Sequence, residues 1–239
     1  MPALVAVVGR QASGKTRVVC GLLQELTARG RRVGAVKHAR EGFQLDLEGK
    51  DSWRHAQAGA EPVALSSTRS FALLRKQDDE ATLEQIRDEH FWGCDLVIGE
   101  GFRESAVPKI EVLPAGEAPT APAGDLIALV LEESPDSASS PPAQAGLPTF
   151  RLDQMKELAD LLEARLLRCR KPGARLLVDG KPVPLTSFPA ACLRGTMAGF
   201  ISSLRGVPAR PREVWLRLRL DAAPQESSQE EQGDQQSRG

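Results

Sequence analysis

Residues 3–16 read ALVAVVGRQASGKT, and this stretch decides the fold of the chain. Its first half is a short apolar run without interruption, which is typical of a strand buried on both faces of a parallel sheet. Its second half, residues 9–16, fits the Walker A pattern G-x-x-x-x-G-K-[ST], a glycine-rich loop between a strand and a helix. Such a loop wraps a phosphate with its backbone N–H groups. The stretch therefore predicts a P-loop that binds a nucleoside triphosphate.

The chemistry of this loop assigns its residues. Glycines supply backbone conformations that a Cβ would hinder, the Lys15 ammonium can bridge the β and γ oxygens, and the Thr16 hydroxyl can ligate Mg²⁺. A lysine at a helix N-terminus with no anion beside it would be unfavourably placed, so a glycine-rich turn that binds nothing is the weaker interpretation. The predicted nucleotide-binding residues of the loop are Gly9, Ser13, Gly14, Lys15 and Thr16.

Strand and helix patterns alternate beyond the loop. A helix is expected over residues 15–29, with Gly30 as the residue that ends it. Residues 109–113 alternate as a strand at a sheet edge would, and Asp153 is expected to cap a helix over residues 153–168. The other predicted strands are 3–8, 33–36, 62–65, 71–74, 95–98 and 126–131, with a helix at 82–90. The order favours a P-loop NTPase fold, a three-layer α/β/α arrangement with a mainly parallel sheet.

Composition suggests three parts. A P-loop domain is predicted over residues 1–170, a small α+β appendage over 171–221 and a disordered tail over 222–239. Residues 132–148 are expected to form a loop. Within the appendage we expect a hairpin with strands at 175–178 and 183–185 around Asp179-Gly180, a helix at 188–204 and a strand at 213–220.

Bulk properties exclude several classes. Lys and Arg total 31 against 32 Asp and Glu, so no global field exists to hold nucleic acid or an anionic membrane. Cys20, Cys94, Cys169 and Cys192 lack metal-ligand spacing and are expected to be buried free thiols. No apolar run reaches the roughly 18 residues of a membrane span, and the motif begins too early for a signal peptide. We expect a cytoplasmic protein.

A second acidic group is expected at the end of another central strand. Asp95 precedes the apolar run 95–98 and lies at the wrong end of it, whereas Glu100 follows at the carboxyl end, where ligands of open α/β sheets collect. Glu100 is therefore favoured as a catalytic residue and, with Thr16, as a Mg²⁺ ligand. Arg103 could reach a phosphate or a second substrate from the same turn.

Another charged cluster lies in residues 45–52, LDLEGKDS, after the second strand. Asp46 and Asp51 could serve Mg²⁺, a catalytic water or a substrate amine, but a solvated charged loop explains the spacing equally well. The chain has no Asn-Lys-x-Asp or Thr-Lys-x-Asp, the pattern by which many GTPases read guanine. The residues themselves therefore leave ATP and GTP open.

Four stretches together resemble the molybdopterin-guanine dinucleotide biosynthesis protein B family, MobB. They are GRQASGKT at 9–16, VKH at 36–38 followed by LDLEGKDSWRHAQAGA at 45–60, DLVIGEGFRES at 95–105, and PKIEVL at 108–113. The resemblance implies a homodimeric GTP-binding accessory protein with Mg²⁺ and at most slow GTP hydrolysis. Its partner would be the guanylyltransferase that attaches GMP to molybdopterin to form the dinucleotide form of the molybdenum cofactor.

The resemblance also implies that Asp46, Lys50 and Asp51 line the opening of the P-loop, with Asp51 and Glu100 as the catalytic candidates. Three departures stand out: residues 39–41 replace a further histidine, Gly99 replaces a larger aliphatic residue, and residues 131–133 replace a Ser-Asp. If that Ser-Asp reads guanine, the base preference here is less certain. Two other classes stay open, a small P-loop kinase acting on a metabolite and a nucleotide-switched scaffold acting through residues 172–221.

Overall fold

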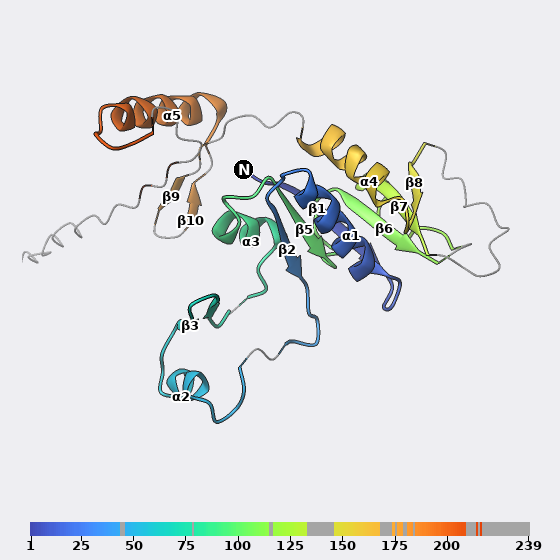
Figure 1. Cartoon of the computed structure of the whole chain (residues 1–239), viewed down its shortest axis with the longest axis horizontal. Coiled ribbons are helices and arrows are strands. Elements are labelled where there is room, and N and C mark those ends of the chain that lie inside the picture. The colour runs from blue at the N-terminus through green and yellow to red at the C-terminus, as the bar shows by residue number, and fades with distance from the viewer. Residues whose placement is uncertain are drawn as a thin grey trace, which may run out of the picture. The chain divides into compact units, whose positions relative to one another are not determined.

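A computed structural model describes most of the chain, and its core is a single parallel sheet. The described residues are 1–43, 46–77, 79–114, 117–132, 146–167, 174, 176–178, 181–183, 185–208, 214 and 216. The sheet has six strands in the order β2-β5-β1-β6-β7-β8, all paired in parallel (Figure 1). These are β1 (Ala3–Gly9), β2 (Val33–Lys37), β5 (Leu96–Glu100), β6 (Lys109–Leu113), β7 (Leu126–Leu131) and β8 (Thr149–Arg151). The predicted parallel α/β fold is confirmed; β8, three residues long, escaped prediction because so short a run has no readable period.

One face of the sheet is covered by α1 (Lys15–Ala28) and α4 (Met155–Leu162), which continues as a π-helical turn, Glu163–Leu167. On α1 the fully buried residues Val18, Leu22 and Leu26 recur at every fourth position, so one stripe of the helix faces the sheet. Gly30 ends α1 as predicted, with φ +78°, and the Arg31 N–H donates to the Leu26 carbonyl over 3.0 Å.

The other face is covered by α3 (Leu83–His90) and by extended segments. Thr82 caps α3 through a capping box with Gln85. Beyond α3, the buried side chains of Phe102, Val107 and Ala121 close the core from the segments that flank β6. The fold is thus layered as predicted, but among the described residues the second outer layer is only partly helical.

The prediction that residues 109–113 form an edge strand is wrong. In the structure β6 lies between β1 and β7, and all five of its residues are buried. The alternation that suggested an edge comes from Lys109 and Glu111, which are each 1% exposed and satisfied by polar partners rather than by solvent.

Two further predictions about local structure are wrong. Gln154, not Asp153, is the N-cap of α4, and the Gln154 side-chain oxygen accepts a hydrogen bond from the Arg151 N–H over 2.8 Å. Cys20 and Cys192 are exposed rather than buried. Cys20 lies on the face of α1 opposite its core stripe. Cys94 is partly buried, and Cys169 lies outside the described residues.

The segment between β2 and α3 forms a separate unit of secondary structure, which we call the α2–β4 segment (residues 51–74). It contains α2 (Asp51–Gln57) and an antiparallel hairpin of β3 (Val63–Ser66) and β4 (Phe71–Leu74). These strands were predicted within a residue, but they pair with each other and not with the central sheet. Beyond β4, Arg75 forms a two-pronged ion pair with Glu89 of α3, at 2.5 and 2.7 Å.

The chain divides into two compact units, Met1–Arg194 and Gly195–Gly239. The predicted hairpin is present as β9 (Leu176–Val178) and β10 (Lys181–Val183), with its second strand two residues earlier than expected, and the predicted helix is α5 (Ser187–Ser202). Of the strand predicted at 213–220 only Val214 and Leu216 are described, and neither lies in a strand. The tail at 222–239 and most of the loop at 132–148 lie outside the described residues, so the domain boundaries at 170 and 221 stay predictions. Within the described ranges no helix combines the length and apolar character needed to cross a bilayer.

An ion-pair cluster fastens α4 to the end of α1. The Arg29 guanidinium lies 2.7 Å from Glu25, 2.6 Å from Asp160 and 3.0 Å from Glu163, and Arg31 donates to Glu163 over 2.6 Å. The hydrogen bond from Arg31 is the largest influence on Glu163 and, with that from Arg29, lowers the pKa of its carboxyl below the ordinary value of 4.5 despite partial burial.

Because this pKa is lower in the folded than in the unfolded chain, the Glu163 charge stabilises the fold above pH 4.5, and the contribution disappears as the pH falls through the folded-state pKa. Glu163→Gln should reduce the free energy of unfolding at neutral pH by about 1 kcal/mol, and the deficit should shrink as the pH falls below 4.5. Urea denaturation across this range measures both values. Glu157→Gln, on the exposed side of the same helix, is the matched control, and a deficit that does not change with pH would contradict the linkage.

Candidate functional site

The predicted phosphate loop joins the end of β1 to the start of α1. Gly9 has φ +150°, and a Cβ there would lie 2.5 Å from the Val112 carbonyl oxygen of β6. Gly14 has φ +77° and is the N-cap of α1. Both glycines are therefore required, Gly9 by close approach to the neighbouring strand and Gly14 by a left-handed turn.

Ser13 has a buried hydroxyl that a ligand of the loop could satisfy. Its residue is 3% exposed, and its Oγ has no hydrogen-bond partner among the described residues. An unsatisfied buried hydroxyl costs about 1–3 kcal/mol. A phosphate oxygen held by the loop would accept this hydrogen bond and remove that cost.

Positive charge gathers at the open side of the loop. We call this region the mouth, and it contains Lys15, Thr16, Lys37, Glu100 and Arg103. Lys15 donates to the Arg10 carbonyl of its own loop. Burial is the largest influence on Lys15 and lowers the pKa of its ammonium; nearby Glu100 raises it, and the positive charges of Arg103 and Lys37 lower it again. One carboxylate thus faces several cations, and this excess of positive charge suits a polyphosphate.

Strand order brings the remaining groups of the mouth together. Thr16 Oγ1 donates to Glu100 Oε1 over 3.0 Å, and Lys37 Nζ lies 3.4 Å from the same oxygen. In the sheet β5 lies between β1 and β2, with Glu100 paired to Val7 on one side and to Lys37 on the other. Lys37 was missed as a site residue because its position beside Glu100 follows from strand order and not from spacing in the chain.

The mouth fits a magnesium ion that is shared with a nucleotide. Thr16 Oγ1 and Glu100 Oε1 are adjacent hard oxygen donors, the kind that Mg²⁺ prefers. Among the described residues no three His, Cys, Asp or Glu side chains gather to hold a metal. A metal here would therefore take its other ligands from phosphate oxygens and water.

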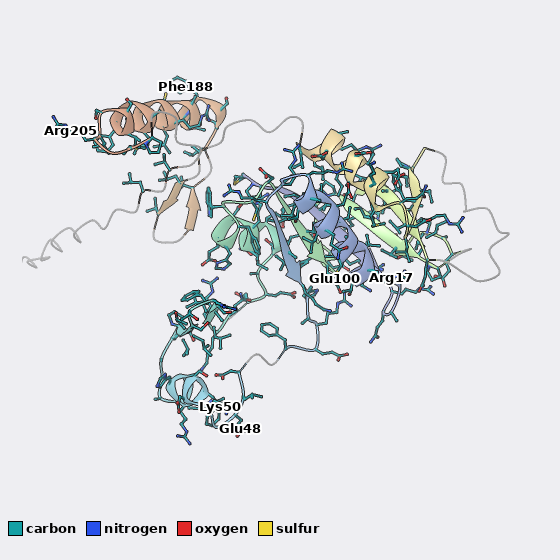
Figure 2. The ribbon with its side chains drawn as sticks, viewed as in Figure 1. Arg17, Glu48, Lys50, Glu100, Phe188 and Arg205 are labelled. Carbon is teal, nitrogen blue, oxygen red and sulfur yellow. The ribbon has the colours of Figure 1, made fainter. Side chains whose placement is uncertain are left out.

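Asp46, Lys50 and Asp51 are not joined to the mouth within one chain. Asp46 accepts a hydrogen bond from Ser52 over 2.7 Å, Lys50 precedes α2 and Asp51 is its first residue. No hydrogen bond or ion pair between described residues links them to the phosphate loop, and Figure 2 shows Lys50 well apart from Glu100. Their predicted roles stay predictions.

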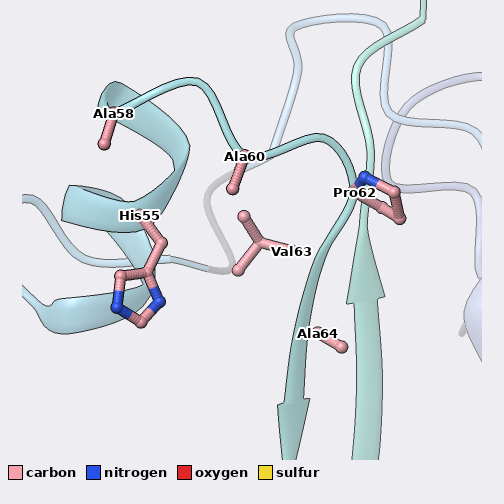
Figure 3. Close-up of a pocket in the computed structure, with 6 residues that line it drawn as sticks. All are labelled: His55, Ala58, Ala60, Pro62, Val63 and Ala64. Atoms are coloured by element: carbon pink, nitrogen blue, oxygen red, sulfur yellow. The ribbon is translucent and has the colours of Figure 1, made fainter.

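A shallow pocket of about 350 Å³ lies beside α2, away from the predicted site. Figure 3 shows its lining, which is mainly small apolar side chains with one imidazole. The lining residues are His55, Ala58, Ala60, Pro62, Val63 and Ala64. None of them is a candidate site residue, and the pocket has no cation for a phosphate.

Gly99, the unusual residue in β5, has a packing explanation. A Cβ on Gly99 would lie 2.7 Å from Leu83 and 2.9 Å from Phe102. Its absence lets α3 and Phe102 close against the strand. Phe102 in turn lies 5.2 Å, between ring centroids, from His38, which pairs with Glu80. The small residue thus makes room for this packing next to the site.

A parallel sheet with a phosphate loop after β1, a lysine and threonine at its mouth and a carboxylate ending β5 defines a P-loop nucleotide-binding protein. The family model for Molybdopterin guanine dinucleotide synthesis protein B, MobB, matches residues 4–132, more than half of the 239 residues. The chain belongs to the MobB family.

Several relatives carry the name molybdopterin-guanine dinucleotide biosynthesis adapter protein. The Haemophilus influenzae protein is 36% identical over 108 residues, 45% of this chain and 61% of that protein, and the Escherichia coli protein is 32% identical over 120 residues, 47% and 66%. This chain therefore spans less than two thirds of either relative. A relative from Methanocaldococcus jannaschii is 26% identical over 227 residues, 85% of this chain and 92% of its own. Among solved structures, MobB of Bacillus subtilis has a TM-score of 0.55 and 28% identity, covering 69% of this chain and 98% of that one.

Lys15→Ala should weaken binding of Mg·GTP and Mg·ATP roughly 10- to 100-fold, because it removes the charged donor shared by the phosphate oxygens. Isothermal titration calorimetry measures the change. Arg17→Ala, an exposed cation two residues further along α1, is the matched control and should bind as the natural chain does. Nucleotide affinity equal to the control in a folded Lys15→Ala variant would remove the site assignment.

Proposed function

We propose that this chain is a GTP-binding accessory protein of molybdenum cofactor biosynthesis. It assists a guanylyltransferase in attaching GMP to molybdopterin, which yields molybdopterin guanine dinucleotide. The observation that carries the proposal is the phosphate loop with Lys15, Thr16 and Glu100 at its mouth, in a chain of the MobB family. The adapter names of the relatives support the pathway and a partner-assisting role.

The residues of the site would bind different parts of the Mg²⁺–nucleotide complex. The backbone N–H groups of the loop, Ser13 Oγ and Lys15 Nζ bind the phosphates. Thr16 and Glu100 would hold Mg²⁺, which when bound offsets the charge on the phosphate oxygens. Glu100 also stands where it can accept a proton from an attacking water, with Asp51 as the second catalytic candidate.

The kinase alternative is less well supported. Such an enzyme needs a mobile lid whose arginines reach over the phosphates, and residues 69–92 offer only Arg69, Arg75 and Arg87 without lid-like composition. Arg75 there is engaged with Glu89 and Arg87 with Asp88. These ion pairs hold the arginines to α3 and its approach, so they favour an accessory protein over a kinase.

A homodimer would complete the site. The hairpin of the α2–β4 segment leaves Phe71 70% and Leu73 49% exposed on one face. Apolar side chains of this size on a hairpin suit a second copy of the chain. We propose that Asp46, Lys50 and Asp51 of one copy serve the phosphate loop of the other in this dimer, since no bond between described residues links them to it within one chain. We propose that this dimer is cytoplasmic.

The double change Phe71→Ser and Leu73→Ser should convert the dimer to a monomer in sedimentation velocity, because it removes the apolar contact between the copies. Phe188→Ser changes an equally exposed phenylalanine, 76%, on α5 and should leave the dimer intact. A dimer that survives the double change would contradict this interface.

The function is tested by measuring nucleotide turnover with and without a molybdopterin-loaded guanylyltransferase, using GTP and ATP in parallel. We expect Mg·GTP binding, little turnover by the chain alone and faster dinucleotide formation by the transferase when the chain is present. No effect on the transferase would contradict the accessory role, and rapid phosphorylation of an added metabolite would favour a kinase.

Glu100→Gln serves as the diagnostic variant in this assay. It should retain nucleotide binding and reduce hydrolysis roughly 100-fold, the usual effect of removing a general base. Glu104→Gln, an exposed carboxylate four residues along, is the matched control. Lost binding with unchanged hydrolysis per bound nucleotide would contradict the role of Glu100.

A further inference from the structure

Glu111 is a carboxylate at an unusual place. It lies in the middle of β6, a central strand of a parallel sheet, and it is 1% exposed. Such strands are ordinarily apolar on both faces, and a buried carboxylate costs several kcal/mol unless it is paired and hydrogen-bonded. The proposed function assigns no role to Glu111.

The partners of Glu111 come from one loop. Glu111 Oε2 accepts hydrogen bonds from the N–H groups of Thr120, over 3.0 Å, and Ala121, over 2.9 Å. Glu111 Oε1 accepts a third from Thr120 Oγ1 over 2.5 Å. The buried carboxylate therefore holds residues 120–121 by main chain and side chain together.

Thr120, which Glu111 holds in place, also contacts Arg103. The same Thr120 hydroxyl accepts a hydrogen bond from Arg103 Nη1 over 2.5 Å, and Arg103 Nη2 lies 3.8 Å from Glu111 Oε1. A guanidinium has five N–H donors, and in the described part of the chain only this one is engaged in a hydrogen bond. The side chain is 31% exposed, so its other donors can reach a ligand.

The charge of Arg103 lies at the mouth. It follows Glu100 by three residues, and its charge is near enough to Lys15 to lower the pKa of that ammonium. The loop that contains Thr120 also touches the phosphate loop, since Glu117 forms an ion pair with Arg10 at 2.8 Å. In P-loops the amides surround the inner phosphates and the lysine reaches the β and γ oxygens, so a further cation near Lys15 would be within reach of the terminal phosphate.

We propose that Glu111 is a positioning residue that acts through Thr120 to hold the Arg103 guanidinium against the terminal phosphate, so that the chain prefers a nucleoside triphosphate to a diphosphate. The inference rests on the proposed nucleotide site. A guanidinium suits this task because its planar fork binds two oxygens of one phosphate at once. A fixed fork also discriminates better than a mobile one, because less side-chain entropy is lost when the phosphate binds.

The same strand offers a control for a purely structural role of Glu111. Lys109 is also 1% exposed, lies on the same face of β6 two residues earlier, and pairs with Asp125 at 2.7 Å. Its ammonium also donates to the Ser105 and Val107 carbonyls, which precede the strand. Removing this charge should cost stability as the loss of Glu111 does, but it removes no hydrogen bond of Arg103.

The test is the ratio of GTP to GDP affinity, measured by calorimetry with Mg²⁺ on the full chain. The natural chain should prefer GTP. Arg103→Lys, Thr120→Val and Glu111→Gln should each lower the ratio about 10-fold through weaker GTP binding, with GDP affinity changed less than about twofold. Thr120→Ser keeps the hydroxyl and should restore the ratio, and Lys109→Met should leave it unchanged while lowering the unfolding temperature.

The outcomes separate the two ideas. If the natural chain binds neither nucleotide, the proposed function and this inference both fall. If it binds both but without preference, or if folded Arg103→Lys and Thr120→Val keep the natural ratio, only the inference falls. Equal weakening of GTP and GDP in these variants would likewise overturn it, because the network would then shape the site without reading the terminal phosphate. Thr120→Val against Thr120→Ser decides the matter even if Glu111→Gln does not fold.

Discussion

The rest of the site depends on the excess of positive charge around Lys15. Its ammonium is partly desolvated, Lys37 and Arg103 lie near it, and Glu100 is the carboxylate that raises its pKa. Like charges lie this close because the parallel strands end at the same edge of the sheet. The loops that follow the strands start at that edge too. The arrangement favours any ligand that brings several negative charges, which a triphosphate does.

Two features of the fold keep this arrangement rigid. The close approach of Gly9 to the Val112 carbonyl fixes the phosphate loop against β6, and the buried Glu111 fixes the loop after β6 against Arg103. Both features use the same strand, one through its backbone and one through a side chain. β6 therefore contacts two of the segments that form the mouth, although none of its residues belongs to the phosphate loop.

Local chemistry explains which parts were predictable. Residues 3–16 form strand, loop and helix start from signals within a few positions, so the phosphate loop and α1 were predicted to within a residue. Glu100 was predictable because the carboxyl end of a parallel strand is recognisable from the apolar run before it. Asp153 failed as a cap because α4 begins later than predicted, with Gln154 as its N-cap and the Gln154 side chain bonded to the Arg151 N–H.

The sequence by itself determined that the chain has a phosphate loop on a parallel α/β sheet and which family it resembles, since those signals are contiguous. Only the tertiary structure decided the strand order, and with it that Lys37 meets Glu100, that β6 is central, and that Glu111 reaches Thr120 and Arg103. The physical reason is that the same type of charged residue can be buried or exposed, and the residue type alone does not distinguish the two cases. Which one a residue becomes depends on the partners that distant segments bring to it.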